Sequence, residues 1–323
     1  MRKLFYIRNS ELFQGMKYLN KKNRKNYFEG WYFKNICGDI GISFIPGISI
    51  SKDGYKAFIQ IITDDKSYYV NYDIDDFEYS DNPFYIKIRN NYFSSDRIHI
   101  DINDKELNLR INGDLKYSKS KNIKTNIFNP NIMGPFSYVT FMQCNHAILS
   151  MKNSINGEII INNKSLIFTN GSGYIEKDFG TSFPKYYLWA QSNNFKNKNA
   201  SFMISIADIT FKLFNFRGLI CSLIVNNKGY KFTTYNKTKI IKYEVDNDNI
   251  NIRLKKGKYI LNIKSKINSS LGLIAPIKGN MEKEIFESIN SIIHITLKHK
   301  DKIIFDDIST NSGIEVVTSV RNF

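Results

Sequence analysis

The segment 171–193 holds the densest set of side chains that could carry out chemistry, and it reads GSGYIEKDFGTSFPKYYLWAQSN. In an extended chain Tyr174, Glu176 and Asp178 share one face, because strand side chains alternate between the two faces. Two neighbouring carboxyl groups raise each other's pKa, so one of them can hold a proton near neutral pH. Glu176 and Asp178 are therefore candidate catalytic acids. The structural alternative is a buried network of Glu176 with Lys177 or an arginine that joins two domains.

The end of the same segment alternates aromatic rings with amides. If this stretch is a strand, one face carries Tyr187, Trp189, Gln191 and Asn193. Unpaired amides are costly in a dry core. The mixture therefore suits the wall of a cavity that binds a ligand with both rings and hydroxyl groups.

A further carboxylate lies among aromatic rings in residues 27–34, which read YFEGWYFK. Alternation places Glu29 on the same face as Trp31 and Phe33. Glu29 is thus another candidate acid. The alternative is a structural ion pair at the mouth of a barrel, with Trp31 in the core.

One histidine is predicted to point toward an apolar space. In residues 138–150 (YVTFMQCNHAILS), alternation puts His146 on the same face as Met142, Cys144 and Ile148. His146 is therefore a candidate catalytic or hydrogen-bonding residue, and a core histidine with satisfied hydrogen bonds is the alternative. The patterns around the other three histidines place them in solvent: His99, His294 and His299.

Strand patterns surround this central part of the chain. Alternating apolar and polar residues broken by Asn, Asp and Gly run from residue 41 to 117 and return after residue 157, with turns such as NNKG at 226–229. The composition changes between residues 129 and 195, as at a junction. For 323 residues we predict an all-β protein with domains at 1–155 and 156–323 and the site at their junction. The segment 280–289 fits either helical turns or a strand.

Composition narrows the class of protein. Hydrophobic residues make up 42% and aromatic residues 14%, so a packed, strand-rich core is expected. The net charge of +16 comes without any nucleic-acid-binding signature, which favours a solvated basic surface and is compatible with peripheral contact with anionic membranes. Three cysteines without CxxC spacing, no secretion signal and no long apolar run favour a cytoplasmic protein. No motif for a metal or nucleotide cofactor is present, so we expect neither.

Three segments, YFEGWYFK, MQCNHAILS and GYIEKDFGTSFPKYYLWAQSN, resemble the ordered motifs of tocopherol cyclases. Weaker similarity at 271–293 and 311–317 extends the resemblance over nearly the whole chain. The resemblance implies two lipocalin-like antiparallel β-barrels or sandwiches in tandem. Tocopherol cyclases add a hydroquinone hydroxyl across a prenyl double bond, a reaction that needs neither oxidation nor a cofactor.

The resemblance also implies roles for the candidate residues. Glu176 is the expected proton donor, because distantly similar carotenoid hydratases carry an acid at the matching place, and Glu29 or Asp178 are the alternatives. The reaction further requires aromatic faces around a developing cation and groups that hold the hydroxyl. The expected pocket residues are Trp31, Tyr32, Tyr187 and Trp189, and the expected head-group ligands are His146, Lys177, Gln191 and Asn193.

One departure from the family pattern bears on the substrate. Where the family usually shows Asn-Trp-Gly after its Glu-Lys pair, this chain has Asp178-Phe179-Gly180. A tocopherol precursor is therefore not assumed. The sequence leaves two hypotheses, a cofactor-independent cyclase or hydratase of a prenylated aromatic or isoprenoid alkene, and a lipocalin-like protein that binds a hydrophobic small molecule without turnover.

Overall fold

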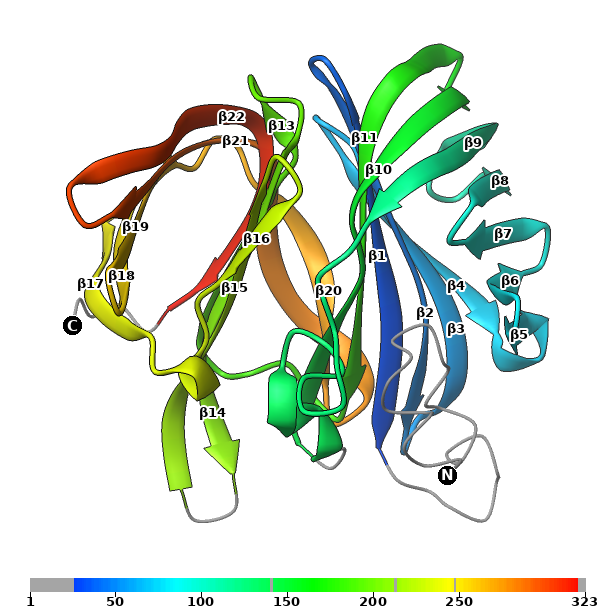
Figure 1. Cartoon of the computed structure of the whole chain (residues 1–323). Helices are drawn as coiled ribbons and strands as arrows, with labels where there is room; N and C mark the ends of the chain where they lie inside the picture. Colours follow the sequence, from blue (N-terminus) through cyan, green and yellow to red (C-terminus); the bar gives the residue numbers. More distant parts are fainter. Residues whose placement is uncertain (1–25, 140–141, 212–213, 247, 319–323) are drawn as a thin grey trace.

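The computed structural model describes residues 26–139, 142–211, 214–246 and 248–318. Within these ranges the chain is built from antiparallel strands in two eleven-stranded sheets (Figure 1), which confirms the all-β, lipocalin-like prediction. The N-terminal segment used in the export prediction lies outside the described residues, as do Thr140 and Phe141. No helix within the described ranges is long and apolar enough to cross a membrane.

The first sheet takes up the chain as far as residue 180. Its strands are β1 (Tyr27–Cys37), β2 (Ile40–Ser51), β3 (Gly54–Ile62), β4 (Ser67–Asp73), β5 (Phe77–Asp81), β6 (Phe84–Ile88), β7 (Asn91–Ser94), β8 (Arg97–Asp104), β9 (Leu109–Lys121), β10 (Cys144–Ile161) and β11 (Lys164–Gly180). Strands that follow one another in the chain are neighbours, except β4 and β5, which form the two edges of the sheet, and the first strand, β1, pairs with the last, β11.

The second sheet repeats this plan. It contains β12 (Tyr187–Ser192), β13 (Asn194–Phe195), β14 (Ala200–Phe211), β15 (Phe214–Val225), β16 (Lys228–Lys231), β17 (Lys239–Asp246), β18 (Asn249–Lys256), β19 (Tyr259–Lys266), β20 (Leu271–Ile277), β21 (Asn280–His299) and β22 (Lys302–Val317). Its first strand, β12, pairs with its last, β22. Three short 3-10 helices complete the described elements: η1 (Ile74–Asp76), η2 (Gly134–Tyr138) and η3 (Thr234–Asn236).

Asparagine-rich turns close several hairpins, as the sequence predicts. Asn226 and Asn227, between β15 and β16, have φ angles of 48° and 66°. Both central residues of a tight hairpin turn need a positive φ, which asparagine tolerates better than most residues. Asn162 and Asn163 make the same kind of turn between β10 and β11, with φ of 46° and 68°.

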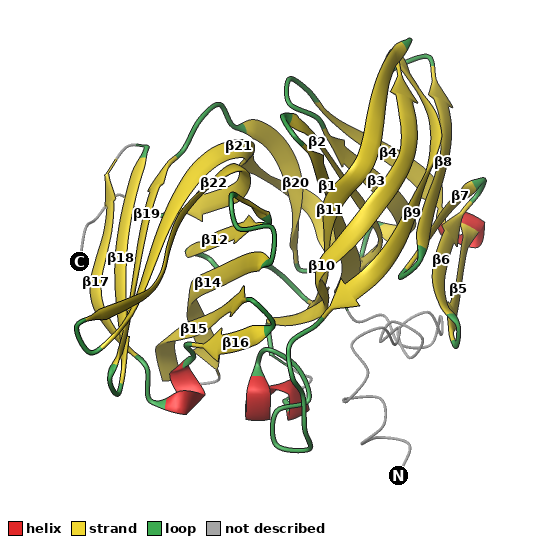
Figure 2. Ribbon diagram, turned by 45° about the horizontal axis from the view of Figure 1, so that its top comes forward, coloured by secondary structure: helices red, strands yellow, loops and turns green. Residues whose placement is uncertain are grey.

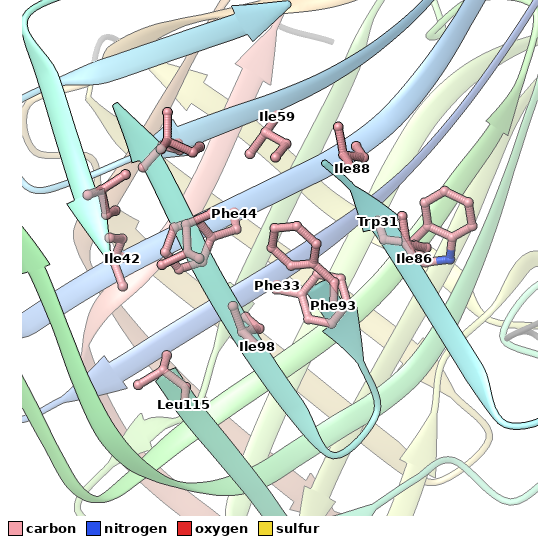
Figure 3. Packing of buried hydrophobic residues seen from close by; sticks show 14 of the residues in the cluster. Trp31, Phe33, Ile42, Phe44, Ile59, Ile86, Ile88, Phe93, Ile98 and Leu115 are labelled. Atoms are coloured by element: carbon pink, nitrogen blue, oxygen red, sulfur yellow. The ribbon is translucent and has the colours of Figure 1, made fainter. Parts of the chain in front are cut away.

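Each sheet curves around an apolar core of its own, and a third apolar cluster lies between the sheets. Inside the first sheet Trp31, Phe33, Phe44 and Phe93 are fully buried (Figure 3). The two sheets lie next to each other as separate curved layers (Figure 2). The cluster between them combines residues of both sheets, so the junction is itself a packed core.

Hydrogen bonds also join the two sheets. The buried side chain of Gln60 on β3 donates from Nε2 to the carbonyl of Ile274 on β20 at 2.9 Å, and its Oε1 accepts from the Ile274 amide at 2.9 Å. One glutamine side chain therefore replaces a backbone partner. This pairing fixes β20 against the first sheet.

The change of sheet does not coincide with the predicted domain boundary. Residue 155 lies within β10, whereas the chain passes from one sheet to the other between Gly180 and Tyr187. The reason is that the β10–β11 hairpin completes the first sheet by pairing with both β9 and β1. The segment 280–289, which the sequence pattern leaves undecided, is the start of strand β21.

Candidate functional site

A cavity of about 170 Å³ lies between the two sheets and is lined mainly by apolar side chains. A cavity of roughly 150 Å³ is large enough to hold benzene. The first sheet contributes Phe28, Tyr32, Ile45, Phe58, Cys144, His146, Glu176 and Asp178 to its wall, and the second contributes Tyr187, Trp189, Phe216, Leu219, Ile220, Leu273, Ile285 and Glu315. The cavity therefore lies at the junction where the sequence analysis places the site.

Strand register brings the polar residues of the first sheet together. On β11, Glu176 lies opposite Tyr32 of β1, and Asp178 lies opposite His146 of β10. Gly180 ends the strand with a φ of 155°, and a Cβ there would lie 2.2 Å from the carbonyl oxygen of Gln143. Only glycine fits this backbone conformation and this close approach. The chain can then leave the sheet immediately after the polar cluster.

His146 lies between the two carboxylates of β11. Its Nδ1 is 2.9 Å from Oδ1 of Asp178, and its Nε2 is 3.3 Å from Oε2 of Glu176. Burial lowers the pKa of His146, but the two neighbouring carboxylates outweigh burial and hold it well above its ordinary value. The raised pKa favours the protonated imidazole, which lies in the wall of a largely apolar cavity.

Glu176 receives hydrogen bonds from several sides. Oε2 of Glu176 accepts a 2.5 Å bond from the Tyr174 hydroxyl and a 3.2 Å bond from Nε1 of Trp189, and it also lies next to His146. Donors around one oxygen stabilise a carboxylate over a carboxylic acid. Trp189 belongs to the second sheet, so this bond also ties the two sheets together at the pocket.

The His146, Glu176 and Asp178 cluster is the group among the described residues whose ligand atoms could hold a metal ion, because these atoms all lie within 4.8 Å of one another. An imidazole and two carboxylates suit several divalent cations. In the present arrangement a proton on His146 would occupy the position of such an ion. The expectation of a metal-free protein stays a prediction.

A second pair of carboxyl groups approaches the pocket from the other sheet. Glu287 on β21 and Glu315 on β22 are direct partners in the strand pairing. The Tyr32 hydroxyl donates to Glu287 at 2.5 Å, and the Tyr187 hydroxyl donates to Glu315 at 2.8 Å. Burial raises the pKa of Glu287 to about 7, and burial together with the charge of Glu287 raises the pKa of Glu315 well above its usual range.

Several residues that the sequence analysis assigns to the site lie elsewhere. Glu29 is fully buried, and its Oε1 lies 3.2 Å from Nζ of Lys177. Neither residue lines the cavity, and Trp31 packs in the core of the first sheet. Odd-numbered residues of β1 and β11 in this region face the barrel interior, so Glu29 and Lys177 form the structural ion pair that the sequence analysis considered as the alternative. Lys177 does not pair with Glu176, because adjacent strand residues point to opposite faces.

Gln191 on β12 and Asn193, which follows this strand, also lie outside the lining. Gln191 is fully buried, and Nδ2 of Asn193 donates to the carbonyls of Met151 and Gly173 at 3.0 and 2.9 Å. Asn193 therefore links backbone segments. By contrast, Tyr187 and Trp189 line the cavity, as does Tyr32.

Sequence reasoning missed Glu287 and Glu315, although a signal was present. In the strand pattern Glu287 shares a face with Ile285 and Ile289, both of which are buried, and Glu315 lies in the apolar run Ile314–Val317. A charged residue on the apolar face of a strand is unusual enough to mark a candidate site.

The comparison with known families agrees with this arrangement. The profile of the family described as tocopherol cyclase-like matches residues 124–318, which is more than half of the chain and includes both acidic clusters. This chain belongs to the tocopherol cyclase-like family. The predicted resemblance is thereby confirmed. A search of curated proteins found no significant match.

Solved structures share the fold at low sequence identity. CghA in complex with Sch210972 superposes with a TM-score of 0.58 at 7% identity, covering 91% of this chain and 89% of CghA. Kievitone hydratase from Nectria haematococca gives a TM-score of 0.50 at 10% identity, with coverage of 91% and 89%. A putative AttH from Nitrosomonas europaea gives 0.50 at 10%, with coverage of 95% and 97%. At these identities the likeness establishes the fold alone.

Proposed function

We propose that this member of the tocopherol cyclase-like family is a cofactor-independent enzyme that adds an O–H group across an alkene of an apolar substrate. The O–H group belongs either to a phenol of the same molecule, which gives cyclisation, or to water, which gives hydration. The substrate class is a prenylated aromatic compound or another isoprenoid alkene. One structural neighbour is named a hydratase and another holds a small molecule, which supports a small-molecule reaction in this fold.

The observation that carries the proposal is the position of His146 between Glu176 and Asp178 in the wall of a largely apolar cavity. A protein that only stored an apolar ligand would gain nothing from burying three ionisable groups, because burial of charge is costly. Strongly perturbed ionisable groups in a cleft are typical of catalytic sites.

The reaction balances without an oxidant or a reductant. A proton adds to one alkene carbon and leaves a tertiary cation on the other, the oxygen of the O–H group bonds to the cationic carbon, and the hydroxyl proton passes to a base. The pocket must therefore supply one acid and one base. The aromatic faces of Tyr32 and Trp189, whose ring centroids are 5.3 Å apart, would stabilise the cation.

In this scheme Glu176 takes the proton from the attacking hydroxyl. The sequence analysis expects it to donate a proton, but the hydroxyl of Tyr174 and the indole N–H of Trp189 both donate to it. We therefore assign Glu176 as the base, with Asp178 orienting His146 and His146 holding the negative charge of the substrate oxygen.

Composition supports a proposal for the cellular location of the protein and for its contact with membranes. The three cysteines are free thiols, and this supports the reducing cytoplasm as the location. A net charge of +16 would draw the protein toward anionic membranes, from which an isoprenoid substrate can be collected. Nucleic acid is not an expected partner.

Turnover of defined probes tests the proposed function. Purified protein and a Glu176→Gln variant are incubated in D₂O with a panel of prenylated hydroquinones and isoprenoid alkenes, and product mass, deuterium content and ligand binding are followed together. We expect deuterium on carbon in the wild-type product, with turnover lowered by about 10²–10⁴-fold in a variant that still binds. Tight binding without product in the wild type would instead support the non-catalytic, lipocalin-like binding protein.

A further inference from the structure

We propose that Glu315 is the acid that protonates the alkene, and that Glu287 is the positioning residue that keeps a proton on it. This assignment rests on the proposed function and names the proton donor that the function requires. It places the acid on the second sheet, opposite the base on the first.

The geometry gives Glu315 access to the substrate space. It lines the cavity, whereas Glu287 lies behind it and is fully buried. Glu315 is partly exposed, and it forms part of the pocket wall. The hydroxyl of Tyr187, which also lines the cavity, donates to Oε2 of Glu315 at 2.8 Å and fixes the carboxyl orientation.

Glu287 leaves one oxygen open for its neighbour. Oε1 accepts from the Tyr32 hydroxyl, whereas Oε2 is buried and has no hydrogen-bond donor among the described residues. Glu287 is directly opposite Glu315 across the β21–β22 pairing, and the two carboxyls are close enough to share a hydrogen bond. A carboxyl–carboxyl hydrogen bond needs one proton between the two groups. The open Oε2 is the acceptor for that proton.

The surrounding charges favour a protonated pair. Burial is the largest effect on both carboxyls, and their mutual repulsion adds to it on Glu315. The ionisable groups that act on the pair are Tyr32 and Lys34 from β1, Glu176 and Asp178 from β11, and Tyr187 from β12. His146 from β10 lies next to Glu176 and Asp178. Lys34 is the one cation that acts strongly on Glu287, but burial lowers its own pKa to about 7. It therefore compensates the pair only in part.

Trp189 lies beside both the acid and the base. It lies opposite Glu315 in the β12–β22 pairing, and its Nε1 donates to Glu176. An alkene lying against the Trp189 ring would be close to both carboxyls. Two carboxyls held in different surroundings are a usual arrangement for acid and base in one site.

The step is balanced. Glu315 gives its proton to an alkene carbon and becomes a carboxylate, the cation forms beside Trp189, the substrate oxygen bonds to it, and Glu176 takes the hydroxyl proton. Return of that proton from Glu176 to Glu315 through solvent completes the cycle. If capture fails, the Glu315 carboxylate can remove a proton from a carbon next to the cation and restore an alkene.

This last property separates the acid from the base in an experiment. The same prenylated hydroquinone probes are incubated in D₂O with the wild type, Glu315→Gln, Glu176→Gln and the control Glu284→Gln, which changes an exposed glutamate on the same strand as Glu287. We expect Glu315→Gln to bind the probe and to lose turnover by about 10²–10⁴-fold, with no deuterium in recovered probe. We expect Glu176→Gln to lose product while recovered probe gains deuterium at the alkene, and the control to behave as the wild type.

The outcomes separate the two proposals. Two results with Glu315→Gln would overturn the assignment of the acid and leave the proposed function in place. One is turnover at the wild-type rate, and the other is deuterium exchange at the alkene. Absence of any labelled product with the wild type overturns both. A second variant keeps the proposal testable if Glu315→Gln does not fold. Tyr187→Phe keeps the carboxyl of Glu315 and removes only the hydrogen bond that Tyr187 donates to it. It should retain alkene exchange at a reduced rate, and complete loss of exchange in Tyr187→Phe but not in Glu315→Gln would contradict the assignment.

The role of Glu287 has a readout of its own. Activity that needs a protonated Glu315 falls as pH rises through the pKa of that carboxyl. Because the charge of Glu287 raises this pKa, Glu287→Gln should move the alkaline limb of the kcat profile to lower pH while kcat at acidic pH is retained. An unchanged alkaline limb would contradict the positioning role.

Discussion

The two acidic clusters of the pocket differ in their partners rather than in their burial. On the first sheet, Glu176 and Asp178 enclose the positively charged His146. On the second, Glu287 and Glu315 face each other, with tyrosine hydroxyls as their hydrogen-bond donors. A cation between two carboxylates removes their repulsion, whereas two carboxyls alone relieve it by keeping a proton. One pocket can thus hold a base and an acid at the same pH.

A third buried carboxylate shows what a purely structural solution looks like. Glu29 pairs with Lys177 inside the first sheet and also accepts from the Tyr27 hydroxyl at 2.7 Å. The pair is closed off from the pocket, although Lys177 follows Glu176 directly in the chain. The face of the strand, and not the position in the sequence, decides whether a side chain reaches the pocket.

Removing the imidazole of His146 from the first cluster should have the largest effect on the stability of the protein. In His146→Leu the two carboxylates would lose their shared partner, and we expect a stability loss of about 3 kcal/mol at neutral pH, measured by urea denaturation. The loss should shrink at acidic pH, because protonation removes the repulsion between carboxyl groups. His99→Leu is the control, because its ion pair with Asp114 is largely exposed and should be worth less than about 1 kcal/mol. Equal losses in the two variants would contradict the contrast between the clusters.

The second cluster should make stability depend on pH in the opposite way to an ion-paired carboxylate. A carboxyl whose folded pKa is raised gives stability that is present below its unfolded pKa and is lost as pH rises through the folded value. For Glu287 this window runs from about 4.5 to about 7. Glu287→Gln should therefore flatten the loss of stability over this range by up to about 3 kcal/mol. Glu284→Gln should leave the curve unchanged, and a Glu287→Gln curve that matches the wild type would rule out a raised pKa.

Substitution of Lys34 should change the pKa of Glu287 without removing either carboxyl of the second cluster. Its Nζ is buried, and no described residue accepts a hydrogen bond from it. Because its charge lowers the pKa of Glu287, Lys34→Met should raise that pKa and move the alkaline limb of kcat to higher pH. The shift has the opposite sign to that of Glu287→Gln. A shift to lower pH in Lys34→Met would contradict the electrostatic account.

Removal of metal ions should have the smallest effect. If a proton on His146 fills the space between the carboxylates, prolonged treatment with a chelator should leave both stability and turnover of the probes unchanged. Loss of turnover that added Zn²⁺ or Mg²⁺ restores would show that an ion occupies the His146 cluster instead.

Much of this arrangement is readable from the sequence, and the rest depends on contacts between distant strands. Alternation correctly places His146, Glu176 and Asp178 on one side of their strands, since a period of two is a local property. Alternation also places Glu29 and Tyr32 on different faces of the same strand. It does not predict which of these faces packs against the second sheet. The choice of face follows from the pairing of β1 with β11, more than a hundred residues away in the chain.

The pairing of Glu287 with Glu315 could not be predicted from alternation either, because it also depends on contacts between strands. Glu287 and Glu315 become neighbours only through the β21–β22 register, which includes several bulges. Glu315 reaches the pocket because β12 pairs with β22 and brings Trp189 beside it, and Glu287 lies behind it. A single charged residue in an apolar strand marks a candidate functional residue, but its partner is determined only by the fold.

The infrared absorption of protonated carboxyl groups in the ligand-free protein tests the central claim most directly. At neutral pH we expect the wild type to show the band of a buried carboxylic acid, Glu176→Gln to retain it, and Glu315→Gln to lose most of it. Loss of the band in Glu176→Gln together with its retention in Glu315→Gln would place the proton on the first sheet and contradict the division between acid and base.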